Sequence, residues 1–154
     1  MVLPCRRPAD DGAKAWASVE ERGYEGMVAK DPRSIYRSGS TRAWMKLKIR
    51  REGVFLVGGI RDVNAFDGVL VGERVGDELR YRGVVEWGFS ALDVLALLDH
   101  ARRWGRKTSL FAEQLRTRSV TWVEPRLAAE VSYSEIMDGR LRAASWRSLI
   151  VETA

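Results

Sequence analysis

The sequence predicts a mainly β protein of the α+β class, in which a short helix-containing segment precedes a small antiparallel β domain. Apolar and polar residues alternate strictly over residues 44–49, which is the two-residue period of a strand with one covered face. After Arg50, short apolar runs recur between glycine-containing turns, and one longer stretch has helical spacing. The boundary between the two parts is therefore expected near Arg50.

The first part is expected to contain one helix and two strands. In order, these are a helix ending near Arg22, a strand at 24–30, a loop at 31–43 and a strand at 44–49. Asp10 or Asp11 can cap the helix at its N-terminus, and Gly23 can end it. The loop is rich in proline, glycine, serine and threonine, which interrupt any regular spacing.

The second part is expected to contain five strands and one helix. The strands are expected at 54–60, 68–75, 78–86, 127–136 and 141–150, and the helix at 90–104. Ser90 can cap the helix, and His100 is expected on its surface. The expected apolar set of the helix is Leu92, Leu95, Leu98 and Ala101, with Val94 and Leu97 alongside. Residues 106–121 are polar and expected to be irregular. Five strands with one helix between the third and fourth are the layout of an OB-type barrel.

Composition excludes several classes of protein. The chain has 154 residues, enough for one domain or two very small ones, and 45% hydrophobic with 31% charged residues is typical of globular proteins. One cysteine, Cys5, and one histidine, His100, leave no internal disulfide and no Cys/His zinc site. The sequence has no apolar run long enough to span a membrane and no secretory signal, so a cytoplasmic location is expected.

Positive charge is concentrated in the first third of the chain. Residues 1–50 hold 11 basic and 6 acidic side chains, whereas residues 51–154 hold 15 of each. Between Lys30 and Arg51 there are eight basic side chains and one acidic residue, Asp31. Such a cluster favours a polyanion and phosphate above all, although a solvated basic face would have the same composition.

Two lysines on one strand form the most specific constellation. Lys46 and Lys48 leave the same face of the strand at 44–49, roughly 7 Å apart along the backbone, and two cations so placed can hold one phosphate. Glu25, at the start of the preceding strand, could bind magnesium, which prefers carboxylate and phosphate oxygens. The alternative is that both lysines are simply the solvated face of an edge strand.

Several segments resemble one family. Glu-Gly-Met-Val-Ala-Lys at 25–30, followed by Trp-Met-Lys-Leu-Lys at 44–48, resembles motifs IV and V of the covalent nucleotidyltransferases. The flanking segments 22–32, 36–39 and 55–60 are similar to bacterial ATP-dependent DNA ligases. Residues 122–125, 129–131 and 138–142 are similar to the ligase domain of bacterial end-joining enzymes. The resemblance extends over about residues 10–149.

The resemblance implies an architecture, cofactors and a substrate. Residues 1–50 would be the C-terminal remnant of the nucleotidyltransferase (adenylation) domain, and residues 51–154 an OB-fold DNA-binding domain. The cofactors would be Mg²⁺ and ATP or AMP, and the partner nicked duplex DNA in DNA repair. The implied residues are Glu25 for the metal, Lys46 and Lys48 for the AMP phosphate, Lys30 and Arg42 for the cofactor, and Arg37, Arg42 and Arg142 for DNA.

The sequence departs from the family pattern at two places. The family adenylates a lysine in a Lys-x-Asp-Gly motif, and these 154 residues contain no such motif. At the C-terminal end, Ala143 and Ala144 stand where the family has His-Pro, and residues 150–153 replace its Arg-Glu-Asp-Lys. We therefore expect no self-adenylation by this chain alone. It would work with a second chain that supplies the lysine, act on adenylated DNA, bind nicks or duplex without catalysis, or be an inactive relic.

An incomplete first domain has a physical consequence. The apolar residues Val28, Met45, Leu47 and Ile49 would lack sheet partners from the rest of that domain. They must pack on the second domain, pair between chains or stay partly exposed, so self-association or poor solubility is expected.

Overall fold

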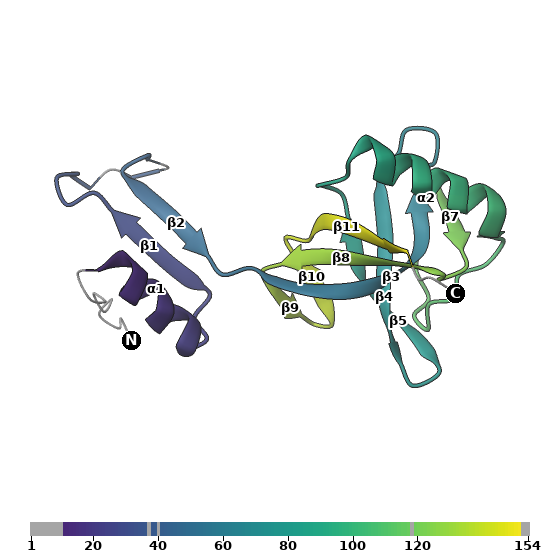
Figure 1. Ribbon diagram of the computed structural model, residues 1–154, viewed down its shortest axis with the longest axis horizontal. Helices are drawn as coiled ribbons and strands as arrows, with labels where there is room; N and C mark the ends of the chain where they lie inside the picture. Colours follow the sequence, from purple (N-terminus) through teal and green to yellow (C-terminus); the bar gives the residue numbers. More distant parts are fainter. Residues whose placement is uncertain (1–10, 37, 40, 118, 152–154) are drawn as a thin grey trace. The chain divides into compact units, whose positions relative to one another are not determined.

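The computed structural model describes residues 11–36, 38, 39, 41–117 and 119–151 (Figure 1). The chain divides into two compact units, Met1–Ile49 and Arg50–Ala154. The class is mainly β with two helices and antiparallel sheets, as predicted. No helix in the described part of the chain has the length and apolar character that crossing a membrane requires.

The first unit is a helix beside a two-stranded sheet, which Figure 1 shows in purple and dark blue. Helix α1 (Gly12–Glu21) begins at Asp11, whose carboxylate accepts a hydrogen bond of 2.9 Å from the Ala13 amide, as the capping pattern predicted. It ends before Gly23, whose φ of +65° suits glycine at a helix C-terminus. Strands β1 (Gly26–Lys30) and β2 (Trp44–Lys48) follow and pair antiparallel.

Few side chains of this first unit are buried. Among its described residues only Ala15 and Val19, both on α1, are fully buried. Val28, Met45 and Leu47 keep 48, 59 and 37% of their surface exposed. Within their own unit these apolar side chains are therefore partly exposed, and packing on the second domain or pairing between chains stays a prediction.

The second unit is built on one branched antiparallel sheet. Its strands are β3 (Arg51–Arg61), β4 (Gly68–Val75), β5 (Glu78–Val85), β6 (Gly105–Arg106), β7 (Val120–Val123), β8 (Leu127–Tyr133) and β11 (Ser145–Val151). The main order is β11-β8-β3-β4-β5, while β7 pairs with the end of β3 and with β6. Strands β9 (Glu135–Met137) and β10 (Arg140–Arg142) form a separate hairpin.

The long strand β3 organises the core. Its first half pairs with β8, its second half with β4 and β7, and a register shift between Val57 and Gly59 separates the two halves. Bulges of this kind bend a strand, so that one strand can serve two parts of a curved sheet. The fully covered side chains that pack together here include Val57, Ile60 and Trp146.

Helix α2 (Ala91–Trp104) packs on this core through only part of its predicted apolar set, including Leu97 and Ala101. Ser90 and Asp93 form a reciprocal capping box, as the sequence suggested for Ser90. However, the buried residues of the helix are Leu97 and His100, whereas Leu92 and Leu95 are 78 and 63% exposed. The prediction that His100 lies on the surface was wrong, because its Nε2 lies 2.9 Å from the Glu124 carbonyl oxygen.

Two expected strands are each divided in two. The strand expected at 127–136 breaks after Tyr133, and the strand expected at 141–150 breaks at Ala143, whose φ is +50°. Arg50 stabilises this region, because its guanidinium donates to the Ala143 carbonyl at 2.8 Å and to Ser132 Oγ at 3.0 Å. Both breaks turn the chain where the sequence has neither glycine nor proline.

Barrel closure is not observed in the described part of the chain, because no strand ladder joins β5 to β11. Side chains tie the β9–β10 hairpin to β5 instead. Arg82 on β5 donates to the Gly139 carbonyl at 3.1 Å, and Arg140 on β10 donates to the Tyr81 carbonyl at 2.9 Å. The Arg140 guanidinium also lies 4.0 Å from the centre of the Tyr81 ring. The predicted OB layout is thus matched in class, but not in a closed ladder.

Candidate nucleic-acid interface

The register of β1 and β2 gathers the predicted lysines on one face. Val28 lies opposite Lys46, Gly26 opposite Lys48 and Lys30 opposite Trp44. Because directly opposed residues of an antiparallel pair point to the same side, the three lysines share one face. We call this set, Lys30, Trp44, Lys46 and Lys48, the lysine face. Its lysines are all exposed.

Glycine at position 26 is required by the close approach of the two strands. Gly26 has a φ of +156°, and a Cβ there would collide with the Leu47 carbonyl oxygen and lie 2.8 Å from the Lys48 Cα. The Ile49 amide also donates to the Glu25 carbonyl at 2.9 Å, extending the pairing by one step. This tight junction brings the Glu25 side chain to the end of β2.

Glu25 and Lys48 form an ion pair. The Lys48 Nζ lies 2.6 Å from Glu25 Oε1, and both side chains remain more than half exposed. The hydrogen bond from Lys48 and the charge of its ammonium lower the pKa of the Glu25 carboxyl below its ordinary value. The two residues that the sequence assigned to metal and phosphate therefore contact each other.

Glu25 fits a magnesium ion only in part. No group of three or more Asp, Glu, His or Cys side chains that could hold a metal occurs among the described residues. A single carboxylate suits Mg²⁺ when phosphate oxygens and water supply the other ligands. The residues present are therefore compatible with a metal that arrives with a phosphate, and they do not form a metal cage by themselves.

The loop between β1 and β2 is folded around Trp44. The indole Nε1 donates to Ser34 Oγ at 3.2 Å, and the ring centre of Tyr36 lies 5.5 Å from that of Trp44. Lys30 Nζ lies 4.1 Å from the Trp44 ring centre, a cation–π arrangement. Arg42 is exposed just before β2, and Arg37 lies outside the described residues. Sequence reasoning missed the Tyr36–Trp44 pair, because it depends on how the loop folds. It also missed the contact of Lys30 with Trp44, because only the strand register brings these two residues opposite each other.

The remaining predicted residue, Arg142, belongs to the second unit. It lies on β10 opposite Glu135, is exposed, and its guanidinium lies 3.6 Å from the Met137 sulfur. The structure thus brings Glu25, Lys30, Lys46 and Lys48 onto one small sheet, with Arg42 in the adjoining loop.

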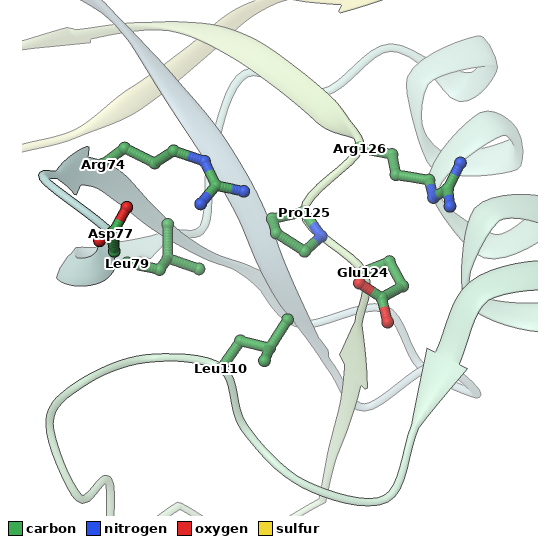
Figure 2. Close-up of a pocket in the computed structure, with 7 residues that line it drawn as sticks. All are labelled: Arg74, Asp77, Leu79, Leu110, Glu124, Pro125 and Arg126. Carbon is green, nitrogen blue, oxygen red and sulfur yellow. The ribbon is translucent and has the colours of Figure 1, made fainter.

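The second unit contains a cleft that includes none of the predicted residues (Figure 2). It has a volume of about 380 Å³. Its lining residues are Arg74, Asp77, Leu79, Leu110, Glu124, Pro125 and Arg126. Figure 2 shows the Arg126 side chain pointing away from the cleft, and its guanidinium lies 3.9 Å from the Trp104 ring centre. Glu124 is paired with Arg106. The cleft therefore offers mainly Arg74 and Asp77 as charged groups.

Comparison with known proteins identifies the family. The model of the ATP dependent DNA ligase C terminal region matches residues 63–150. The chain belongs to the ATP-dependent DNA ligase family. This confirms the resemblance on which the sequence interpretation rested.

The similar proteins are end-joining enzymes. The chain is 33% identical to the multifunctional non-homologous end joining protein LigD of Mycolicibacterium smegmatis, over 97% of this chain and 21% of that protein. It is 30% identical to LigD of Pseudomonas aeruginosa, over 85% of this chain and 17% of that protein. The chain therefore spans about a fifth of the length of these relatives.

Two solved ligase structures share the fold. The ligase domain of M. tuberculosis LigD is 34% identical with a TM-score of 0.62, covering 91% of this chain and 48% of that one. A mycobacterial DNA ligase D complexed with ATP and MES is 32% identical with a TM-score of 0.62, covering 93% of this chain and 49% of that one. This chain thus corresponds to about half of a ligase domain.

Proposed function

We propose that this chain supplies the second half of a ligase catalytic unit in DNA end joining. Residues 1–50 would be the end of the adenylation domain and would bind the adenylate phosphate, and residues 51–154 would be an OB-fold domain that binds DNA. Lys46 and Lys48 would contact the AMP phosphate, Lys30 and Arg42 would support nucleotide binding, and Arg37, Arg42 and Arg142 would contact DNA phosphates. The substrate would be nicked duplex DNA.

One observation carries this proposal. The antiparallel register sets Lys46 and Lys48 on one face of a short strand, with Glu25 2.6 Å from Lys48. Cations fixed on a strand are preorganised for a phosphate whose charge changes during transfer, whereas loop lysines must be ordered first. Membership of the ligase family makes an adenylated phosphate the natural ligand of such a face.

The ion pair fits a resting state of this site. An incoming phosphate would compete with Glu25 for the Lys48 ammonium, and the released carboxylate would then be available as one Mg²⁺ ligand. When bound, the metal would neutralise phosphate charge. The roles of this chain are thus to hold the phosphate through Lys46 and Lys48 and to provide one carboxylate.

The nucleophile must come from outside these residues. No Lys-x-Asp-Gly motif occurs in residues 1–154. We therefore assign the lysine that would carry AMP to a segment outside these residues, for example on a second chain. The step that these residues can promote by themselves is the last one. In it, the 3′-hydroxyl oxygen attacks the 5′-phosphorus of the DNA strand, the phosphoanhydride bond to AMP breaks, AMP leaves, and the hydroxyl proton passes to solvent water.

A nicked duplex carrying a preformed 5′-adenylate tests this, with Mg²⁺ and without ATP. We expect sealing on a denaturing gel, lost in Lys46→Gln and Lys48→Gln but retained in Lys14→Gln, which removes an exposed lysine from α1. Absence of sealing by the chain, with DNA still shifted on a native gel, would contradict the catalytic proposal.

A non-catalytic module that binds nicks or duplex is the second candidate. The observation that favours it is the Glu25–Lys48 pair itself, since a carboxylate neutralised by a lysine is not free for a metal. In that case the chain would shift nicked DNA equally well with and without Mg²⁺. A variant at Glu25 would likewise give the same shift in both conditions.

A further inference from the structure

We propose that Tyr36, beside Trp44, forms a stacking surface for an unpaired base of a DNA strand that runs along the lysine face. This inference rests on the proposed DNA binding and adds to it a contact with a base. Stacking on aromatic side chains and phosphate contacts to nearby cations are the two components by which proteins bind single-stranded nucleic acid.

Tyr36 is placed as such a surface would require. It keeps 77% of its surface exposed, more than any large hydrophobic residue of the described chain except Leu92. Its ring lies 5.5 Å from that of Trp44 at an interplanar angle of 58°. An exposed aromatic that is held by a second aromatic loses little conformational freedom when a base stacks on it.

The position of Trp44 is fixed by its own contacts. Its indole nitrogen donates to Ser34 Oγ, and Ser34 in turn donates to the Asp31 carbonyl at 2.7 Å. Lys30 lies over the Trp44 ring at 4.1 Å. The tryptophan is therefore the support of the pair, and Tyr36 presents the open ring.

The surrounding charge favours a nucleic acid over a protein partner. Lys30 and Lys46 lie on the lysine face, and Arg33 and Arg42 are exposed in the loop beside Tyr36. The acidic residue of this loop, Asp31, accepts a hydrogen bond of 2.9 Å from the Arg33 amide and so serves the turn. Aromatic rings among cations match a strand in which bases and phosphates alternate.

The test uses a 12-nucleotide single strand that contains one 2-aminopurine, together with a fully paired duplex of the same length. Binding of the chain should change the 2-aminopurine fluorescence. Tyr36→Ala should weaken binding of the single strand about tenfold, while Tyr36→Phe, which keeps the ring, should stay within about twofold of the unaltered chain. Tyr24→Ala, which removes another exposed tyrosine of the same unit, is the matched control.

The outcomes separate this inference from the proposed function. Equal binding of the single strand by the unaltered chain and Tyr36→Ala would overturn the stacking surface. An equal loss on the duplex would overturn it as well, since a paired base is not available. If Lys46→Gln weakens nick binding while Tyr36→Ala changes nothing, the proposed function stands without the stacking surface. If the unaltered chain binds neither DNA, both fail.

Discussion

The two units of the chain stabilise their structure in different ways. The second unit has a continuous apolar core in which Val57, Ile60 and Leu97 are completely covered. In the described part of the first unit only Ala15 and Val19 are buried, and the sheet is held by backbone pairing and by contacts around Trp44. The lysine face therefore lies on the unit with the smaller core, and its geometry depends on strand register more than on packing.

The largest expected effect sharpens the view that the second unit has its own core. Leu97→Ala removes a fully buried side chain of α2 and should lower the free energy of unfolding by about 2–5 kcal/mol. Leu95→Ala, on the exposed side of the same helix, should change it by less than about 0.5 kcal/mol. Urea denaturation followed by tryptophan fluorescence compares them. Equal losses would mean that Leu95 is packed as fully as Leu97, which would contradict this description of α2.

A second change should break the first unit alone. Gly26→Ala would force a Cβ against the Leu47 carbonyl, so the pairing of β1 with β2 should be lost. Hydrogen exchange should then show faster exchange of the amides in β1 and β2, while the amides of β3 and β8 keep their protection. Gly12→Ala, where a Cβ meets nothing within 4 Å, is the control. Loss of protection in both units would contradict their independence.

A smaller effect concerns the ion pair of the lysine face. Lys48 lowers the pKa of Glu25, so the pair contributes stability that is present at neutral pH and lost as the pH falls through that lowered pKa. Lys48→Met should raise the titration midpoint of the Glu25 carboxyl towards its ordinary value, as measured by carbon-13 NMR. An unchanged midpoint would show that the pair does not form in solution.

Local patterns were predicted well, because their signals are local. The alternation at 44–49 gave strand β2 and its two faces, and Asp11 gave the start of α1. The lysine pair of the site was found by the same alternation. These features depend only on neighbouring residues, so no tertiary information was needed.

Features that depend on distant contacts were not predicted. Within the predicted apolar set of helix α2, Leu97 is buried whereas Leu92 and Leu95 are exposed, and His100 is buried beside the Glu124 carbonyl. At the break, the Ala143 carbonyl accepts a hydrogen bond from Arg50, far away in the sequence, and the aromatic pair of Tyr36 and Trp44 depends on how the loop folds. Whether the unit boundary at Ile49 and Arg50 has the assigned domain roles stays a prediction.

The central claim is that the lysine face binds a phosphate of the DNA substrate, and the salt dependence of binding tests it most directly. The logarithm of the binding constant for an adenylated nicked duplex should fall linearly with the logarithm of salt concentration. Lys46→Gln should reduce the magnitude of this slope by about 0.9, the value for one lost phosphate contact, whereas Lys14→Gln should leave the slope unchanged. A slope for Lys46→Gln equal to that of the unaltered chain would contradict the account.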